Sequence, residues 1–358
     1  MNALFDCARI AGIAAAVPTQ TRQLSEFAAI WGENEVARII AATGVSCIRE
    51  APAGMTTADL CAEAATRLLV ELKVDPGSID GIVFVSQTPD HPLPATSALL
   101  QHRLGLPTRI AAFDINYGCS GYVYGLLQAH LLIHAGMCSS VLVCAGDVST
   151  SLISPRDRSL RMLFGDAGSA TLVCAGTERS AFSVHTDGSG AAVLIVPAGA
   201  GRHPRNAATA EMREAEEGNF RSAEHLYMDG TEVMHFALKD VPAMIEAALE
   251  LRGWSKNDPG LYALHQANRF MVDYLRRKMR LQAPAVPFAC EDIGNTGPAS
   301  IPVMLAREHT RLAAEGRLEK TIMCGFGVGL SVAAATLSLA DVLILDVIEV
   351  TSPPSTVN

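Results

Sequence analysis

The stretch IAAFDINYGCSGYVYGLLQAHLLIHA, residues 110–135, decides the fold, and Cys119 lies near its centre. The apolar run Ile110–Ile115 predicts a buried strand, and apolar residues at helical spacing from Tyr122 to Ile133 predict a helix. Between them, NYGCSG predicts a turn with a glycine on each side of the cysteine. A strand, a tight turn and a helix in this order are typical of an α/β fold.

Cys119 has two interpretations at this position. A cysteine just ahead of a helix meets unpaired backbone N–H groups and the positive end of the helix dipole, which favour the thiolate, the nucleophilic form. The small neighbours Gly118, Ser120 and Gly121 leave room for a substrate carbonyl. Equally, a free cysteine is often a small buried hydrophobic residue. From this stretch alone, a nucleophile and a core residue both stay open.

The composition indicates a large, well-packed protein. The chain has 358 residues, 49% of them hydrophobic, only 5% aromatic and 18% charged. At about 150 residues per domain, the length allows two to three domain-sized units. The formal net charge of −9 argues against a nucleic-acid partner, because such proteins neutralise phosphates with lysine and arginine.

The cysteines and the uncharged segments indicate the compartment. Nine cysteines are scattered through the chain without a CxxC pair, which predicts neither a disulfide framework nor a zinc site. We therefore expect a reducing, cytoplasmic location and no metal. No basic segment precedes an apolar run at the start, so no signal peptide is expected. Residues 115–146 and 321–340 lack charges but are broken by glycines and polar residues, which predicts buried segments and no membrane span.

Strands alternate with helices along the rest of the chain, which predicts an α/β class with largely parallel pairing. Strands are expected at 8–17, 46–49, 81–86, 140–145, 169–175, 182–185, 191–197, 260–265, 321–324 and 330–339, and helices at 24–42, 56–72, 95–104, 231–251 and 269–279. The pattern runs twice, which predicts a duplicated domain with halves at 1–180 and 181–358. Residues 198–224 are expected to form a mobile surface loop.

Three further features could assist Cys119, and each has a plain alternative. His265 ends an apolar strand, where sites gather in open sheets, but a lone histidine is often an ordinary core or surface residue. Asn295 lies between glycines in GNTGP and can present an amide donor, or it can be a common Asx-turn residue. The segment Gly325–Gly329 can bring backbone N–H groups to a ligand, or form a bulge. It lacks the spacing of a nucleotide phosphate loop.

Together these motifs resemble a known family. FDINYGCSGYVYGL, LFGDAGSA, LHQAN, GNTGPASIP and GFGVGLSVAAA, in this order, are similar to the ketoacyl-acyl-carrier-protein synthase III branch of the thiolase-fold condensing enzymes. The resemblance extends from the first strand to about Leu339. It implies an α/β fold of thiolase type, a duplicated α/β/α/β/α arrangement in five layers, usually as a homodimer. It implies no metal or organic cofactor.

The resemblance also implies the roles of the site residues. Cys119 resembles the acylated nucleophile, and His265 and Asn295 resemble the pair that promotes decarboxylation. The backbone of Gly327, Val328 and Gly329 is expected to hold the oxyanion. The implied substrates are acyl-CoA and malonyl-acyl carrier protein. The implied reaction moves the acyl group to the cysteine and then forms a 3-oxoacyl thioester by decarboxylative Claisen condensation.

The resemblance implies substrate contacts for some residues, but the sequence departs from the family at other positions. Arg158 matches an arginine beside the CoA adenine, Leu93 lies where a partner subunit's side chain lines the acyl pocket, and Phe326 is expected to contact substrate. Arg38 and Ala42, however, replace a tryptophan and an arginine that commonly hold CoA. The acyl group could therefore arrive on CoA in an altered pose or on a carrier protein.

A cluster of cations follows His265. Arg269, Arg277 and Lys278 lie on one expected helix and give a basic face that could steer an acidic carrier protein. An ordinary solvated helix face is the alternative.

Two other functions stay open. One is an acyltransferase of the same fold that moves the acyl group to an oxygen, nitrogen or sulfur acceptor without decarboxylation. The other is a non-catalytic partner subunit of a heteromeric synthase. The complete set of Cys119, His265 and Asn295 argues against the second, because such partners usually lose the cysteine.

Overall fold

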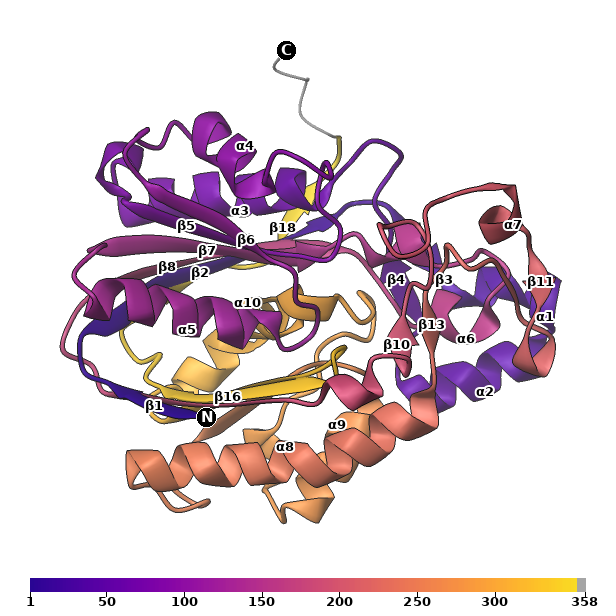
Figure 1. Ribbon diagram of the computed structural model, residues 1–358. Coiled ribbons are helices and arrows are strands. Elements are labelled where there is room, and N and C mark those ends of the chain that lie inside the picture. Colours follow the sequence, from indigo (N-terminus) through magenta and orange to yellow (C-terminus); the bar gives the residue numbers. More distant parts are fainter. Residues whose placement is uncertain (353–358) are drawn as a thin grey trace.

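The computed structural model describes residues 1–352, and its helices and strands stack in five layers (Figure 1). One sheet has seven strands in the order β17-β2-β8-β7-β5-β6, with β18 also pairing with β2, and the other has five in the order β1-β9-β16-β15-β14. Helices α5 and α10 lie between the sheets, α3 and α4 cover the first sheet, and α8 and α9 cover the second (Figure 1). The predicted α/β/α/β/α layering is confirmed.

The bounds of these elements follow. The first sheet contains β2 (Ala8–Pro18), β5 (Gly81–Val85), β6 (Ala111–Ile115), β7 (Ser140–Asp147), β8 (Ala167–Ala175), β17 (Leu343–Ile344) and β18 (Ile348–Val350). The second contains β1 (Asn2–Phe5), β9 (Ser180–Thr186), β14 (Leu261–Leu264), β15 (Thr321–Gly327) and β16 (Ser331–Leu337). The layer helices are α3 (Thr57–Leu72), α4 (Thr96–Arg103), α5 (Gly121–His134), α8 (Gly230–Arg252), α9 (Arg269–Lys278) and α10 (Ser300–Ala314).

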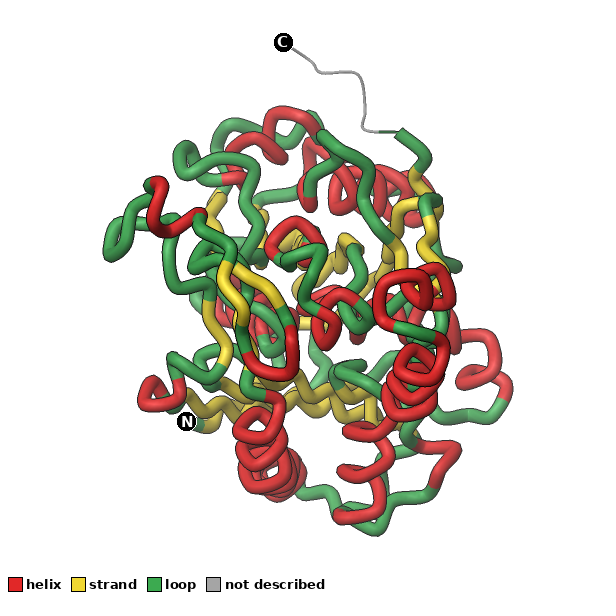
Figure 2. The backbone as a smooth tube through the Cα atoms, turned by 90° about the vertical axis from the view of Figure 1, so that its right-hand side faces the viewer, coloured by secondary structure: helices red, strands yellow, loops and turns green. Residues whose placement is uncertain are grey.

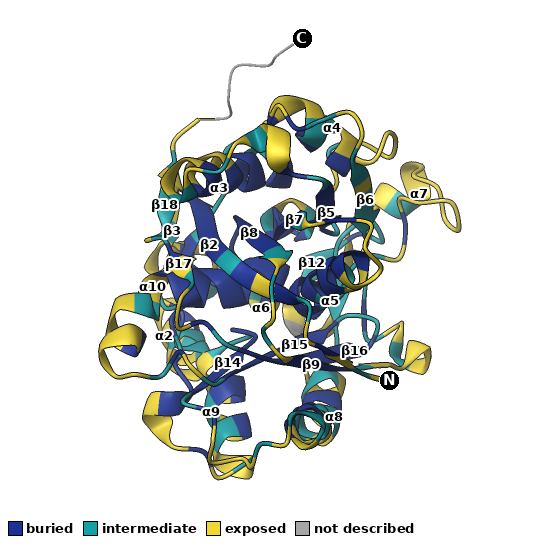
Figure 3. Ribbon diagram, turned by 90° about the vertical axis from the view of Figure 1, so that its left-hand side faces the viewer, coloured by how far each residue is buried: buried dark blue, intermediate teal, exposed yellow. Residues whose placement is uncertain are grey.

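Helix α5 lies very close to the first sheet because two of its residues are glycines. A Cβ on Gly121 would lie 2.5 Å from Val85 Cγ1, and one on Gly125 would lie 2.8 Å from Val143 Cγ1. The helix is apolar on all sides, as expected for an element buried between two sheets. Figure 3 shows the strands and the central helices as the buried interior. This close contact fixes the start of α5, and therefore the turn that carries Cys119.

The two sheets divide the chain near the predicted boundary. Strand β8 ends at Ala175 and β9 begins at Ser180, and the two strands belong to different sheets. Both ends of the chain cross this division, because β1 pairs with β9 while β17 and β18 pair with β2. The N-terminal end therefore belongs to the second sheet and the C-terminal piece to the first.

Strand pairing differs from the prediction in two ways. The pairs β5–β6, β5–β7 and β14–β15 are parallel, but β2–β8, β7–β8 and β15–β16 are antiparallel, so both sheets are mixed. The short strands β17 and β18 also run parallel to β2. In addition, β6 was predicted to be buried, but it ends its sheet and is half-exposed.

Helix α10 was missed in the sequence. Its start, GPASIP, contains two prolines and was interpreted only as a turn, although Ile301, Met304 and Leu305 repeat at helical spacing and are buried. The second proline, Pro302, lies in the first helical turn, where a missing N–H costs no hydrogen bond. The helix begins at Ser300, five residues after Asn295, and so becomes part of the site.

The stretch 198–224, predicted as a mobile loop, contains α7 (Ala207–Ala210), β11 (Arg213–Glu214) and β12 (Phe220–Arg221). It is anchored on the segment before α6 (Arg158–Arg161), since Ser154 Oγ donates to the Phe220 carbonyl at 2.6 Å and the Arg156 guanidinium stacks on the Phe220 ring at 3.8 Å. Loops and short helices gather on this side of the molecule (Figure 2). The preceding strand predicted at 191–197 is reduced to β10 (Leu194–Ile195).

Residues 342–350 lie along the edge of the first sheet and contain β17 and β18, and the Leu345 N–H donates to the Ile13 carbonyl at 3.0 Å. The Arg49 guanidinium pairs with Glu349 at 2.7 Å. Residues 353–358 lie outside the described residues. Within residues 1–352, none of the helices has both the length and the apolar character needed to cross a membrane.

Candidate active site

Cys119 lies in the turn between β6 and α5, pressed against β15 of the other sheet. A Cβ on Gly325 would lie 2.5 Å from the Cys119 carbonyl oxygen, and one on Gly327 would lie 2.9 Å from Cys119 Cβ and 3.1 Å from its sulfur. Only glycine permits this approach. The two halves of the fold therefore meet at the sulfur.

We expect Gly327→Ala to slow acylation of Cys119 by about tenfold or more, because the added methyl group displaces the sulfur and such small shifts cost up to about 10²-fold. The rate of acyl-enzyme formation by intact-protein mass spectrometry measures this. Gly188→Ala is a matched control, since a Cβ there meets no heavy atom within 4 Å. An unchanged rate in Gly327→Ala would contradict the contact.

A chain of serines holds the glycine segment beside the cysteine. Ser331 Oγ donates to the Val328 carbonyl at 2.7 Å, and so the Ser120 hydroxyl, 2.7 Å away, must donate to Ser331 Oγ. Residues 325–327 continue β15, so the predicted glycine loop is reduced to the turn around Val328 and Gly329. The N–H groups of these two residues make no hydrogen bond within residues 1–352. They are available to a ligand oxygen.

His265 follows β14 and is only 2% exposed. Its Nδ1 lies 2.6 Å from Ser300 Oγ at the start of α10, and Phe326 packs edge-on with ring centroids 5.3 Å apart. Burial lowers the pKa of the imidazole to about 3, so the ring is neutral at physiological pH. Ser300 Oγ accepts the Gln266 N–H and is placed to donate to Nδ1. This arrangement assigns the ring proton to Nε2, which becomes a donor.

Asn295 is 4% exposed and fixed on three sides. Its backbone N–H donates to the Leu163 carbonyl at 2.9 Å, and its carbonyl accepts the Gly165 N–H at 3.0 Å. Its Oδ1 accepts the Gly297 N–H at 3.0 Å, which is the Asx turn expected as the alternative. The Nδ2 group has no hydrogen-bond acceptor within residues 1–352. The same turn therefore orients a donor toward the site.

The three side chains share one cavity. Cys119, His265 and Asn295 line a narrow cavity of about 90 Å³, together with Phe326 and Gly327. A second cavity of about 520 Å³ shares Cys119 with it and is lined by aliphatic side chains together with polar ones such as Gln87 and Arg205. We call them the narrow cavity and the acyl cavity. Cys119 lies where they meet, so a thioester could approach through one while its acyl chain occupies the other.

Two family models match the chain: 3-oxoacyl-[acyl-carrier-protein (ACP)] synthase III over residues 113–190, and the C-terminal part of that synthase over residues 249–339. A putative 3-oxoacyl-[acyl-carrier-protein] synthase 3 from Campylobacter jejuni is 31% identical over 346 residues, covering 95% of this chain and 96% of the relative. The chain belongs to the 3-oxoacyl-[acyl-carrier-protein] synthase III family. The predicted family and the predicted acyltransferase class are confirmed.

Solved structures of the synthase III family support this membership. A 3-oxoacyl-(acyl-carrier protein) synthase from Burkholderia xenovorans is 38% identical and superposes with a TM-score of 0.89 over 98% of this chain and 99% of its own. The synthase III from Pseudomonas aeruginosa is 28% identical, with a TM-score of 0.78 over 93% of this chain and 98% of its own. The similarity includes the C-terminal piece in the first case.

The pKa of Cys119 differs from the expectation that helix position favours the thiolate. Burial, with a smaller contribution from the Asp147 carboxylate, raises the pKa of the thiol to about 12. The resting synthase III site thus contains a neutral thiol and a neutral imidazole. The prediction from helix position was wrong because the turn is enclosed by β15.

We expect alkylation of Cys119 by iodoacetamide to accelerate steadily with pH between about 7 and 10. The thiolate is the reactive form, and below a pKa near 12 its fraction rises about tenfold per pH unit. Stopped-time mass spectrometry of the alkylated peptide measures the rate. A plateau below pH 9 would contradict the raised pKa.

Asp147 was missed in the sequence analysis. It ends β7, lines the acyl cavity and is buried, and its Oδ1 accepts from Ser86 Oγ at 2.9 Å and from the Gln87 N–H at 2.7 Å. Burial raises the pKa of this carboxyl to about 7. The sequence indicated this buried acid only by its position at the end of the apolar run SVLVCAGD.

The residues predicted to contact substrates lie in different surroundings. Phe326 is buried beside His265, as described. Arg158 borders the molecular surface, with its Nε 3.2 Å from Glu35 Oε1 on α2 (Glu33–Thr43). Leu93 is 81% exposed and lines neither cavity of its own chain.

The predicted basic helix is only partly exposed as a cationic face. Arg269 pairs with Glu291 at 2.9 Å and stacks on Phe288 at 4.4 Å. Arg277 and Lys278, more than two helical turns beyond Arg269, are exposed. The structure therefore separates Arg269, which is engaged within the chain, from the other two.

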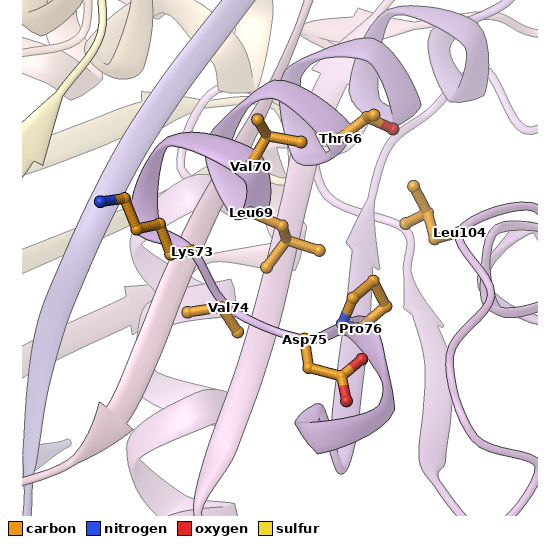
Figure 4. Close-up of a pocket in the computed structure, with 8 residues that line it drawn as sticks. All are labelled: Thr66, Leu69, Val70, Lys73, Val74, Asp75, Pro76 and Leu104. Atoms are coloured by element: carbon orange, nitrogen blue, oxygen red, sulfur yellow. The ribbon is translucent and has the colours of Figure 1, made fainter.

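Two further observations on residues 1–352 indicate no second site. A surface hollow of about 400 Å³ lies at the end of α3, where the charged side chains Lys73 and Asp75 flank aliphatic ones (Figure 4). It contains no nucleophile and no histidine. Within residues 1–352, no three His, Cys, Asp or Glu side chains are grouped so that they could hold a metal ion.

Proposed function

We propose that the protein transfers an acyl group from a thioester to Cys119 and then joins it to a malonyl group carried on acyl carrier protein. The observation that supports this is the pair of donors, His265 Nε2 and Asn295 Nδ2, in the cavity that ends at the cysteine sulfur. Two neutral donors without a base suit an enolate rather than a hydrolytic water. The printed names of relatives, such as the β-ketoacyl-[acyl-carrier-protein] synthase III of Rhodopirellula baltica, agree.

In the first half-reaction, the Cys119 sulfur attacks the thioester carbonyl. The N–H groups around Gly327, Val328 and Gly329 hold the oxyanion, and the acyl chain lies in the acyl cavity. The carbon–sulfur bond of the donor breaks, and the proton of the Cys119 thiol leaves with the departing thiol. Because the resting thiol is neutral, this proton transfer accompanies the attack.

In the second half-reaction, a malonyl thioester enters the narrow cavity. His265 Nε2 and Asn295 Nδ2 donate to its thioester carbonyl, so negative charge collects on that oxygen as carbon dioxide leaves. The enolate carbon attacks the acyl-cysteine carbonyl. The 3-oxoacyl thioester departs, and the released Cys119 sulfur takes a proton from water.

Intact-protein mass spectrometry with a panel of acyl thioesters tests the first step, and release of labelled carbon dioxide after adding malonyl carrier protein tests the second. We expect an adduct at Cys119 and carbon dioxide formed with the product. Adduct formation without carbon dioxide, together with transfer to a hydroxyl, amine or thiol acceptor, would instead establish the non-decarboxylating acyltransferase. Absence of any adduct would favour the non-catalytic partner subunit.

We also propose that the protein is a homodimer paired through β6. This strand is the half-exposed end of the first sheet, and the exposed Leu93 precedes α4, which packs against it. An unpaired apolar edge is a template for pairing with a second copy. Paired copies could place the Leu93 of one chain near the acyl cavity of the other.

The free cysteines agree with the cytoplasmic location that we propose.

Analytical ultracentrifugation should therefore give twice the chain mass of 37.8 kDa. We expect Ala112→Pro, at the exposed edge of β6, to shift the protein toward monomer, because proline cannot donate to a ladder. Ala200→Pro, in the stretch after β10, is the control. A monomeric parent protein would contradict the proposal.

A further inference from the structure

Two polar side chains lie on one wall of the acyl cavity, beside Cys119. Gln87 follows β5 and Asp147 ends β7, and these strands are parallel neighbours in which Val85 is aligned with Ala145. Gln87 and Asp147 each come two residues after that aligned pair, so they leave the sheet side by side. Both line the acyl cavity. The carboxyl edge of the sheet therefore presents a carboxamide and a carboxylate to this cavity.

The Gln87 carboxamide lies against the turn that carries the nucleophile. A Cβ on Gly118 would lie 2.5 Å from Gln87 Oε1, so glycine at this position leaves room for the amide. The Gln87 backbone N–H donates to Asp147 Oδ1 at 2.7 Å, but its side chain makes no hydrogen bond within residues 1–352. The cavity wall next to Cys119 thus offers an unused donor and an unused acceptor.

The Asp147 carboxylate is paired through only one of its oxygens. The residue is 5% exposed, and its Oδ1 also accepts from Ser86 Oγ at 2.9 Å and from Thr88 Oγ1 at 3.3 Å. Its Oδ2 accepts no hydrogen bond within residues 1–352, and a Cβ on Gly297, which also lines the cavity, would lie 3.0 Å from it. Because buried polar atoms are nearly always paired, an unpaired oxygen beside a cavity indicates a ligand.

Much of the remaining cavity wall is aliphatic and includes Leu152, Ile195, Val196 and Leu226. A hydrocarbon chain is stabilised by contact with such side chains. An acyl group that matches both parts of the wall therefore carries one polar substituent close to its carbonyl and a hydrocarbon remainder.

A hydroxyl matches the two polar side chains better than other substituents. It can donate to Asp147 Oδ2 and at the same time accept from Gln87 Nε2. An ammonium group only donates, and it would bring a charge into a largely apolar cavity at high cost. A carbonyl only accepts, so it would leave Asp147 Oδ2 unpaired.

We propose that the acyl cavity selects an acyl group with a hydroxyl on its second or third carbon, bound between Gln87 and Asp147. The hydroxyl lies this close to the thioester because Gln87 contacts the residue that precedes Cys119. This inference rests on the proposed function and names the substrate class of its first half-reaction. Gln87 and Asp147 are the residues that determine this specificity.

The test compares acyl-CoA thioesters in matched pairs in which a methyl group replaces the hydroxyl: 2-hydroxybutyryl with 2-methylbutyryl, and 3-hydroxybutyryl with 3-methylbutyryl. Loading of Cys119 is followed by intact-protein mass. In at least one pair, we expect the hydroxyl compound to load at least about tenfold faster, because a site built for a hydroxyl rejects the analogue that lacks it.

A smaller difference in both pairs, or faster loading of the methyl compounds, would overturn the inference. The proposed function would stand if adducts and carbon dioxide still formed. Faster loading of 3-aminobutyryl-CoA than of either hydroxyl compound would also overturn the inference, because the cavity would then select an amine. No adduct from any thioester would overturn both.

Variants test the two side chains through the ratio of hydroxyl to methyl loading, which a general loss of activity does not change. Gln87→Met keeps the length of the side chain but removes the carboxamide, and it should lower the ratio by about fivefold or more. Asp147→Asn keeps an oxygen for Ser86 and the Gln87 N–H, and it should lower the ratio severalfold because a charged acceptor is lost.

Gln282→Met, at an exposed position outside both cavities, is the matched control and should leave the ratio unchanged. If Gln87→Met slowed both members of a pair by the same factor, Gln87 would act on the thioester itself and the inference would be wrong. A ratio that neither Gln87→Met nor Asp147→Asn changes would equally refute the assigned residues.

Discussion

Cys119→Ala is expected to abolish the acyl adduct and to reduce condensation by at least about 10³-fold, the scale on which loss of a catalytic nucleophile acts. Among residues 1–352, Cys119 is the one cysteine that lines both the narrow cavity and the acyl cavity. Alanine keeps the Cβ that packs against Gly327, so the turn should stay in place. Intact mass after incubation with an acyl thioester, and release of carbon dioxide from malonyl carrier protein, measure the two losses.

Cys174→Ala is the matched control, because Cys174 is a half-exposed cysteine in β8, outside both cavities. It should retain the adduct and full condensation. Thermal unfolding of both variants near that of the parent protein shows that neither change disrupts the fold. An adduct that persists in Cys119→Ala would refute the nucleophile.

Asn295→Asp is expected to separate the half-reactions. Aspartate retains an oxygen for the Gly297 N–H and the shape of the amide, but it replaces the Nδ2 donor by a carboxylate oxygen. That oxygen repels the enolate charge, so carbon dioxide release should fall by about 10² to 10³-fold, as for loss of one oxyanion donor. Acylation should proceed near the parent rate. Single-turnover experiments with preformed acyl-enzyme isolate the second step.

Asn206→Asp makes the same chemical change at the exposed cap of α7, where the side chain accepts from the Ala208 and Thr209 N–H groups. It should change neither step. If Asn295→Asp slowed acylation as much as decarboxylation, Asn295 would belong to the general architecture of the site. If it slowed neither, its role as a donor would be wrong.

Local patterns in the sequence were sufficient to place the main features of the site. The strand that leads to His265 and the turn at Asn295 have the predicted form, and the run before Cys119 is a strand as predicted, although it is half-exposed. Their meeting point was not visible locally, since β15 approaches the Cys119 turn across more than 200 residues. The order of five motifs supplied that information through resemblance to a family.

Local sequence patterns did not predict the features that depend on burial by distant parts of the chain. The raised pKa of Cys119 follows from the contact with β15, and the lowered pKa of His265 follows from burial in the same wall. Ser300 was hidden because a segment with two prolines did not indicate α10. Glu35 and Arg158, distant in the sequence, form an ion pair only after α2 and α6 have been placed.

The C-terminal strands have a consequence for self-assembly. β17 and β18 pair with β2 and contain only two and three residues. This border of the first sheet therefore offers few backbone groups for pairing with a strand of another molecule. Within residues 1–352, the opposite border, β6, is therefore the one that can extend the sheet. A sheet that can grow at a single end forms a two-fold pair and then stops, whereas one open at both ends could propagate into a fibre. The extension thus limits strand addition in this sheet to one event.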